Sequence, residues 1–290
     1  MAKILIIGCG AIGLELAQKL AGCGHLVTGL KRVPPAKNPA NVEFICADIS
    51  IRSDVERLGV DFDYIYFIVS ADKRDEASYV KVYDTGLTNL IEHFTKAKSS
   101  ARWFFVSSTS VYGQNQGEWV DEASDTVPTD NSARLIIKAE QILKSINPAN
   151  IIVRFSGIYG PGREYLLRMA RQTPIIQKNP PYFTNRIHQQ DCIGVLAYLL
   201  EQSINGVKLE PCYLASDDLP VPQWDVITWL ASQMHCQPPL EKSQPTSTGQ
   251  NKRCRNDRIK NLGYRFIYPD YKVGYGEIID ALSNPILSDS

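Results

Sequence analysis

Ile4-Leu5-Ile6-Ile7-Gly8-Cys9-Gly10-Ala11-Ile12-Gly13 joins a run of apolar residues to the turn pattern G-x-G-x-x-G. The continuous apolar run is typical of a strand that is buried on both faces. Apolar residues recur at helical spacing after the glycines as far as Gly22–Gly24, so a helix should follow the turn. Such glycines let the backbone approach a pyrophosphate at the helix N-terminus, where free N–H groups attract anions. The stretch therefore predicts a strand, a dinucleotide-binding turn and a helix, the alternative being a Gly-rich connection without a ligand.

The rest of the first half alternates between strand-like and helix-like segments. Because parallel strands need crossover connections, this alternation predicts an α/β fold with a doubly wound parallel sheet, the Rossmann arrangement. The predicted strands are His25–Leu30, Val42–Cys46, Tyr64–Val69, Trp103–Val106 and Ile151–Arg154, and the predicted helices are Val80–Lys98 and Ala133–Ser145.

The alternation becomes less regular after about residue 158, which suggests a second domain. We expect a dinucleotide-binding domain over residues 1–157, to which residues 187–215 return. Residues 158–186 and 216–290 should form a smaller α/β lobe that binds substrate. Trp224 and Trp229 share an amphipathic segment of that lobe and are predicted to pack in its core.

The composition argues against several classes of partner. The chain has 290 residues with 31 basic and 31 acidic side chains, so it lacks the basic excess of a nucleic-acid binder. Its apolar runs are too short to cross a bilayer, and no signal-peptide segment precedes the first strand, which predicts a cytoplasmic protein. Seven scattered cysteines without a Cys-x-x-Cys pair predict neither a disulfide framework nor a metal site.

The end of the second predicted strand indicates which dinucleotide is bound. An acidic residue there would accept the ribose hydroxyls of NAD, but the sequence reads Leu30-Lys31-Arg32 with no acid nearby. Two cations suit the 2′-phosphate of NADP, and arginine can contact it in a bidentate way. We therefore predict NADP rather than NAD, the alternative for Lys31 and Arg32 being a solvated surface pair. Asp48 is placed either to reach the adenine amino group or to cap a helix that starts near Ser50.

Several separated motifs make the chain resemble the NAD-dependent epimerase/dehydratase group, an extended or atypical branch of the short-chain dehydrogenase/reductase superfamily. The resemblance covers nearly the whole chain and implies epimerase, dehydratase or reductase chemistry on a sugar, in particular a nucleotide sugar. The motifs are the Gly8–Gly13 turn, Ser107-Ser108-Thr109-Ser110-Val111-Tyr112-Gly113, Lys138, Ile158-Tyr159-Gly160-Pro161-Gly162, Arg186–Asp191 and Asn261-Leu262-Gly263-Tyr264.

In that family a Ser or Thr hydroxyl polarises a substrate oxygen, a tyrosine moves the proton, and a lysine binds the nicotinamide ribose and lowers the tyrosine pKa. By motif position Ser108 matches the hydroxyl and Lys138 the lysine, but Arg134 stands at the tyrosine. No tyrosine occurs between Tyr112 and Tyr159. A guanidinium, with a pKa above about 12, cannot exchange a proton at neutral pH. Arg134 should instead clamp an anionic substrate group or stabilise an oxyanion.

Further roles come from the resemblance alone. Substrate contact is implied for Tyr112, Tyr159, Arg163 and His188, and all of these except Arg163 are also candidates for the missing acid/base. Packing is the alternative for both tyrosines, and His188 precedes Asp191, which favours a structural hydrogen bond. Cofactor contact is implied for Gly8, Gly10, Ala11, Ile12, Gly13, Lys31, Arg32, Asp48, Ser70, Lys138, Phe155 and Ile158.

Two surface features have a functional and a plainer interpretation. The basic cluster Lys252-Arg253-Cys254-Arg255 suits the diphosphate of a nucleotide sugar, or else it is a solvated surface. The helices predicted over Val80–Lys98 and Ala133–Ser145 resemble the pair that forms a four-helix dimer interface in many relatives, so a homodimer is expected.

Two functions from different classes follow. The first is an NADP-dependent enzyme that acts on a small-molecule substrate, in particular a nucleotide sugar. The second is a redox sensor that binds NADP(H) without turnover, as the missing tyrosine would suggest. A third resemblance, of Gly8–Gly13 with Gly29–Arg32 to ketopantoate reductase, is weaker, because that family lacks the Ser-rich strand end and has an all-helical second domain.

Overall fold

The computed structural model describes residues 1–243 and 250–283, which form two compact units. Unit 1 comprises Met1–Val111, Pro128–Arg154 and Ile193–Tyr213, and unit 2 comprises the remaining residues. Residues 112–127, 155–157, 187–192 and 214–215 were expected in the dinucleotide-binding domain but group with unit 2, and 112–127 is the longest of these segments. For 112–127 the physical reason is that β6 (Glu118–Val120) pairs in parallel with β15 (Lys252–Cys254), far away in the sequence.

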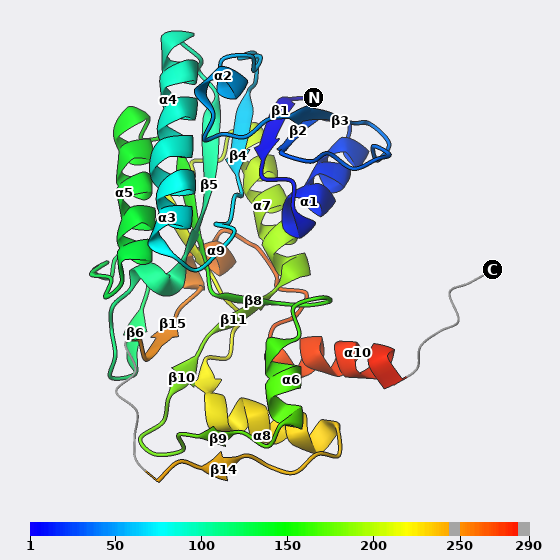
Figure 1. Cartoon of the computed structure of the whole chain (residues 1–290), viewed down its shortest axis with the longest axis vertical. Helices are drawn as coiled ribbons and strands as arrows, with labels where there is room; N and C mark the ends of the chain where they lie inside the picture. Colours follow the sequence, from blue (N-terminus) through cyan, green and yellow to red (C-terminus); the bar gives the residue numbers. More distant parts are fainter. Residues whose placement is uncertain (244–249, 284–290) are drawn as a thin grey trace, which may run out of the picture. The chain divides into compact units, whose positions relative to one another are not determined.

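Unit 1 is built on a seven-stranded sheet of order β12-β7-β5-β4-β1-β2-β3 (Figure 1). The pairs β5·β4, β4·β1, β1·β2 and β2·β3 are parallel, and the four apolar residues of β1 are fully buried. The predicted α/β fold with a doubly wound sheet is confirmed. The strands are β1 (Lys3–Ile7), β2 (Leu26–Lys31), β3 (Val42–Cys46), β4 (Tyr64–Phe67), β5 (Arg102–Ser108), β7 (Ile151–Phe155) and β12 (Cys212–Ala215).

Helices cover the sheet, with α4 and α5 side by side on one face and α1 on the other (Figure 1). The helix predicted over Val80–Lys98 begins earlier, at Glu76, and contains the π-helical segment Val80–Gly86. Among the described residues, no helix is long and apolar enough to span a membrane. The helices are α1 (Ala11–Gly22), α2 (Arg52–Val55), α3 (Glu76–Tyr79), α4 (Leu87–Lys96), α5 (Asn131–Ile146) and α7 (Gln189–Ile204).

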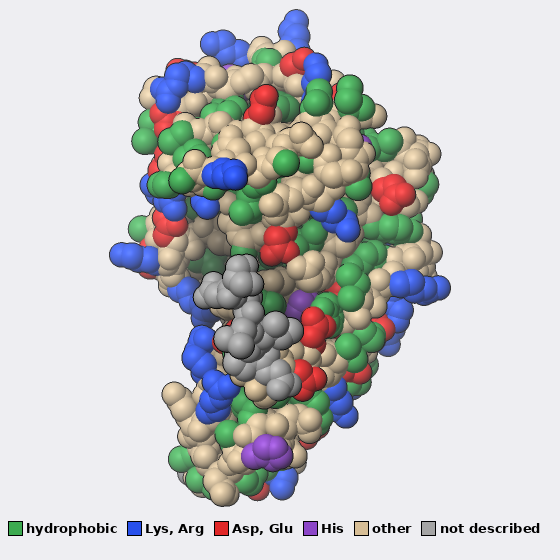
Figure 2. Space-filling view, turned by 90° about the vertical axis from the view of Figure 1, so that its right-hand side faces the viewer, with side chains coloured by type: hydrophobic (Ala, Val, Ile, Leu, Met, Phe, Trp, Pro, Cys, Tyr) green, Lys and Arg blue, Asp and Glu red, His purple; other side chains and the backbone are tan. Residues whose placement is uncertain are grey.

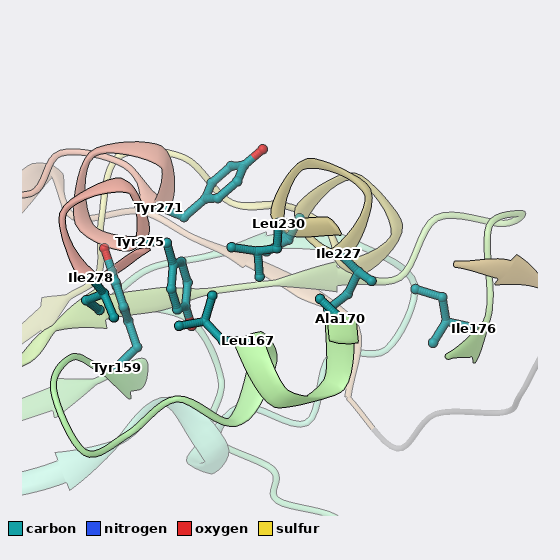
Figure 3. Close-up of a cluster of buried hydrophobic side chains, with 10 residues drawn as sticks. Tyr159, Leu167, Ala170, Ile176, Ile227, Leu230, Tyr271, Tyr275 and Ile278 are labelled. Carbon is teal, nitrogen blue, oxygen red and sulfur yellow. The ribbon is translucent and has the colours of Figure 1, made fainter. Parts of the chain in front are cut away.

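Unit 2 has its own apolar core, in which α6, α8 and α10 pack around stacked Tyr159 and Tyr275 (Figure 3). Trp224 and Trp229 pack against this core, as predicted. The elements are α6 (Tyr165–Arg171), α8 (Gln223–Gln233), α9 (Asp257–Asn261), α10 (Tyr271–Ser283) and the strand pairs β8 (Gly157–Tyr159)·β11 (Arg186–His188), β10 (Phe183–Thr184)·β13 (Val221–Pro222) and β9 (Ile175–Ile176)·β14 (Leu240–Glu241).

Asp191, near the start of α7, binds the segment 264–268 of the same unit. Its fully buried carboxylate accepts hydrogen bonds from the Tyr264 hydroxyl at 2.9 Å and from the backbone N–H groups of Ile267 and Tyr268 at 2.8 and 2.9 Å. A charged acceptor that satisfies three donors stabilises this connection. Asp191 therefore has a structural role in this unit.

Candidate functional site

The turn between β1 and α1 has the geometry that its glycines require. Gly8 has φ +97°, and a Cβ there would lie 2.6 Å from the carbonyl oxygen of Ile68. A Cβ on Gly13 would lie 2.4 Å from the carbonyl oxygen of Gly8, so both positions exclude a side chain. A Cβ on Gly10, by contrast, would meet no atom within 4 Å. The space beside Gly10 is open and lies against bare backbone.

The N-terminus of α1 faces this open space without a competing group. Gly10 is the N-cap residue, so no side chain caps the helix, and its first turn carries no acidic residue. The N–H groups of the first turn, from Ala11 and Ile12 onward, have no acceptor within the helix and carry the positive end of the helix dipole. Open space at an uncapped helix N-terminus fits a pyrophosphate.

The adenosine side of the turn contains an acid that the sequence analysis missed. Arg32, just after β2, donates two hydrogen bonds of 2.7 and 2.6 Å to the carboxylate of Asp72. Asp72 is 40 residues away in the sequence but follows β4, and β2 and β4 both border β1. The end of β2 has no acid close by in the sequence, as stated above, but Asp72 lies beside Arg32 in the structure. Among the described residues, Lys31 makes no ion pair.

Asp48 follows β3 and Ser70 follows β4, at the carboxyl ends of these parallel strands. The Asp48 carboxylate accepts from the backbone N–H of Ser50 at 2.9 Å and from the ammonium of Lys81 at 2.9 Å. Burial would raise the pKa of Asp48, but the hydrogen bonds from Ser50 and Lys81 outweigh it and lower the pKa to about 2. Asp48 thus caps the turn before α2, while Ser70 lies exposed after β4.

Ser108 and Lys138, which were expected to be catalytic, and Arg134, which was expected to bind substrate, each bind other partners. The Ser108 hydroxyl accepts from the backbone N–H of Ser110 at 3.1 Å. Arg134 donates to the side chain of Asn131, one turn earlier in α5, at 2.8 Å. Lys138 pairs with Asp84 of the π-helical segment at 2.6 Å. In the part of the chain that the structure describes, no hydrogen bond or ion pair joins Ser108, Arg134 and Lys138.

The orientation of α5 on the sheet explains why Arg134 and Lys138 do not meet Ser108. Its buried side carries Ile136 and Glu140, and Glu140 accepts a 2.6 Å hydrogen bond from Ser107 at the end of β5. Since successive helical residues are rotated by about 100°, Lys138 lies on the opposite side from both, and it is exposed together with Arg134. The buried residues of α5 are Ala133, Ile136, Ala139, Glu140 and Leu143. None of them is a tyrosine or a lysine.

Three of the residues expected to contact substrate are buried side chains of unit 2. Tyr159 is 3% exposed, and a Cβ on Gly274 of α10 would lie 2.1 Å from its hydroxyl. His188 is also buried, with its ring 5.2 Å from that of Tyr159, and its Nδ1 accepts from the backbone N–H of Gln190. The Tyr112 side chain is fully buried. Packing, the alternative considered for both tyrosines, accounts for their environment, and burial raises the pKa of Tyr159 far above that of a working acid/base.

The remaining assigned residues have mixed environments. Arg163 is exposed, Ile158 lies half-buried in β8 and Phe155 is buried at the end of β7. The cluster at 252–255 is partly structural: Lys252 is buried and donates to the carbonyl of Tyr112 at 3.0 Å. Arg253 lies 4.8 Å from both the Trp119 and the Phe183 rings. Neither Lys252 nor Arg253 is a solvated surface cation.

Comparison with known proteins agrees with the dinucleotide turn. Residues 4–201 match the model of the NAD dependent epimerase/dehydratase family. The chain belongs to the NAD-dependent epimerase/dehydratase family.

Three relatives show how far the likeness extends. A candidate NAD-dependent epimerase/dehydratase from Methylobacillus flagellatus is 36% identical, with 98% of this chain and 99% of that chain covered and a TM-score of 0.83. Protein YeeZ of Escherichia coli strain K12 is 28% identical over 93% of this chain and 97% of its own length. The UDP-glucose 4-epimerase of Thermus thermophilus, solved with NAD, is 18% identical at a TM-score of 0.77, covers 98% and 99% of the two chains, and shows the fold alone.

Within this family fold, unit 2 holds a buried polar cluster that the motifs did not indicate. Arg186 Nη1, Asp217 Oδ2, the Tyr159 hydroxyl and the Ser156 hydroxyl are buried and have no hydrogen-bond partner. Burial raises the pKa of Asp217 to about 8, although the nearby Arg186 guanidinium lowers it. Tyr159 and Arg186 lie in quoted motifs, whereas the sequence offers no signal for Asp217, which follows β12 and donates its backbone N–H to the carbonyl of Arg186 at 2.7 Å.

Proposed function

We propose that the protein binds NADP(H) on unit 1 and uses it in redox chemistry on a small hydroxylated substrate, of the nucleotide-sugar class. The single observation that carries the proposal is the open, uncapped backbone at Gly10, bordered by two glycines that tolerate no side chain. Gly8, Gly13, Ala11 and Ile12 would hold the pyrophosphate, and the bound nicotinamide would supply or accept a hydride. Family membership supports this choice.

The preference for NADP over NAD rests on charge. Lys31 makes no ion pair among the described residues, and Arg32 presents a guanidinium to solvent with its side chain 52% exposed. An exposed arginine can exchange one planar anion for another at small cost, because surface ion pairs contribute about 0–1 kcal/mol. Ser108, at the end of β5, is the hydroxyl available to a substrate oxygen.

Gly10→Val is expected to weaken NADPH binding by at least about 30-fold, equivalent to about 2 kcal/mol. The added side chain fills the open space without touching the fold, so the thermal midpoint should stay close to that of the wild type. Fluorescence titration with NADPH and, in parallel, NADH measures both affinity and preference.

Gly22→Val is the matched control, since a Cβ on Gly22 also meets nothing within 4 Å but lies at the far end of α1. Its affinity for NADPH should match the wild type. Wild-type protein that binds neither dinucleotide, or a Gly10→Val protein that binds both as well as the wild type, would contradict the proposal.

A second candidate function is binding without turnover, as in a redox sensor. The observation that favours it is the exposed side of α5, which directs Arg134 and Lys138 away from Glu140 and β5. A sensor binds the dinucleotide yet shows no change in nicotinamide absorbance with any nucleotide sugar.

Arg134→Tyr separates the two candidates only weakly, because a phenol at this position would also lie on the exposed side. We expect it to create no family-type turnover on a nucleotide sugar. Lys138→Met should leave NADPH affinity within about twofold, because Lys138 lies on the exposed side of α5, opposite the side that Glu140 turns to β5. A tenfold loss of NADPH affinity in Lys138→Met would contradict this expectation and indicate that Lys138 contacts the nicotinamide ribose.

A further inference from the structure

The Arg32–Asp72 ion pair crosses the carboxyl edge of the sheet beside the dinucleotide turn. Arg32 follows β2 and Asp72 follows β4, and β1 lies between those two strands. The turn at Gly8 leaves the same edge from β1, and the end of β4 passes within reach of it, since a Cβ on Gly8 would lie 2.9 Å from the backbone nitrogen of Val69. The ion pair therefore belongs to the surroundings of the proposed adenosine site.

The ion pair with Asp72 occupies the two guanidinium donors of Arg32 that a phosphate would bind. Nη1 and Nη2 of Arg32 each donate to a separate oxygen of the Asp72 carboxylate. A terminal phosphate presents oxygens in the same planar, bidentate arrangement, so carboxylate and phosphate are alternative partners for one guanidinium. The hydrogen bonds from Arg32 lower the pKa of Asp72, so the competing carboxylate stays charged at neutral pH.

Other charged side chains surround the Arg32–Asp72 pair. Asp48 interacts electrostatically with Arg32, and Asp48 and Lys81 both interact with Asp72. Lys81 is paired with Asp48, whereas Lys31 forms no ion pair among the residues that the structure describes. Both side chains of the Arg32–Asp72 pair are about half exposed, at 52% and 55%, so a solute can reach and displace the carboxylate.

We propose that Asp72 is a specificity-determining residue that occupies the 2′-phosphate position on Arg32 and so reduces the discrimination between NADP and NAD. This inference rests on the proposed function, because it assumes that the adenosine side of unit 1 binds a dinucleotide. Binding of a 2′-phosphate transfers the two guanidinium donors from the Asp72 carboxylate to phosphate oxygens. The released carboxylate then lies close to a phosphate of like charge, which opposes binding.

The test compares 2′,5′-ADP with 5′-AMP, two fragments that differ only in the 2′-phosphate. Asp72→Asn is expected to raise the affinity for 2′,5′-ADP by about tenfold and to change that for 5′-AMP by less than twofold, measured by calorimetry at low salt. Asp72→Ser, which also removes the charge, should behave in the same way. Arg32→Gln/Asp72→Asn should lose the gain, because the guanidinium that receives the phosphate is gone.

Asp61→Asn is the matched control for the change in net charge. Asp61 forms a surface ion pair with Lys3 at the opposite end of β1, and its side chain is 86% exposed. This variant should leave the affinity ratio of the two fragments unchanged. A similar increase for 2′,5′-ADP in Asp61→Asn would show a general charge effect and overturn the role of Asp72.

Two further outcomes separate this inference from the proposed function. Wild-type binding of NADPH combined with an unchanged fragment ratio in both Asp72 variants would overturn the inference alone. A loss of 5′-AMP affinity in Asp72→Asn would also overturn it, since the carboxylate would then be a ribose ligand. Failure of wild type and variants alike to bind NADPH, NADH or either fragment would overturn the proposed function itself.

Discussion

Replacing Glu140 with leucine is expected to destabilise the protein by about 3–5 kcal/mol, because it removes the buried carboxylate that pairs with the Arg154 guanidinium inside unit 1. Glu140 accepts two hydrogen bonds from Arg154, at 2.9 and 2.6 Å, and one from Ser107, and both charged side chains are at most 5% exposed. Urea unfolding followed by circular dichroism measures the loss. The variant changes the buried side of α5 and leaves exposed Lys138 and Arg134 in place.

The double variant Glu140→Leu/Arg154→Leu provides the comparison. Removing both charges takes away the desolvation penalty together with the attraction, so this protein should recover much of the stability lost in the single variant. A double variant that is no more stable than Glu140→Leu would mean that the lost packing, rather than the unpaired charge, causes the destabilisation.

A second large effect is expected from Asp217→Asn as the pH is changed. Burial raises the pKa of Asp217 to about 8 from an ordinary value of 3.8, with Asp218 and Asp270 adding to the rise and Arg186 opposing it. The folded protein then holds a proton that the unfolded chain has released, so this carboxyl makes stability fall as the pH rises from about 4 to about 8. Asparagine has a similar shape without the charge. It should flatten that dependence and stabilise the protein at pH 8 by a few kcal/mol, since one pKa unit corresponds to about 1.4 kcal/mol.

Asp225→Asn is the control, because Asp225 is exposed at the start of α8 in the same unit. Urea midpoints of both variants and the wild type are compared between pH 4 and pH 8. The Asp225 variant should follow the wild-type curve. If Asp217→Asn kept the wild-type slope over this interval, the carboxyl of Asp217 would be ionised throughout, with the Arg186 guanidinium as its counter-ion.

The distribution of charge on the surface does not change the predictions about partners. Basic and acidic side chains are both spread over the face shown in Figure 2, in keeping with a formal net charge of zero. Cytoplasmic location, the absence of a nucleic-acid partner and a homodimer through α4 and α5 stay predictions. An NADPH site and a nucleotide-sugar substrate are proposals with the tests given above.

The sequence by itself determined the sheet, the dinucleotide turn and the family. Strands such as β1 and helices such as α5 follow from hydrophobic periodicity, which is a local property of consecutive residues. Gly8 and Gly13 were predictable from the G-x-G-x-x-G pattern, although the atoms that exclude a side chain at Gly8 belong to Ile68 and Val69, which follow β4. The π-helical segment at Val80–Gly86 was not, since its hydrogen-bond pattern leaves no clear trace in composition.

Tertiary structure alone decided which charged groups meet. Asp72 reaches Arg32 across 40 residues because parallel strands bring their carboxyl ends to one edge, and no spacing in the sequence encodes that pairing. The rotation of α5 likewise depends on the hydrogen bonds of Glu140 with Arg154 in β7 and Ser107 in β5. With Glu140 on the buried side, Lys138 lies on the exposed side and pairs with Asp84. Motif position could place Arg134 and Lys138 on one helix. It could not say which side of that helix the core would cover, because burial is set by long-range contacts.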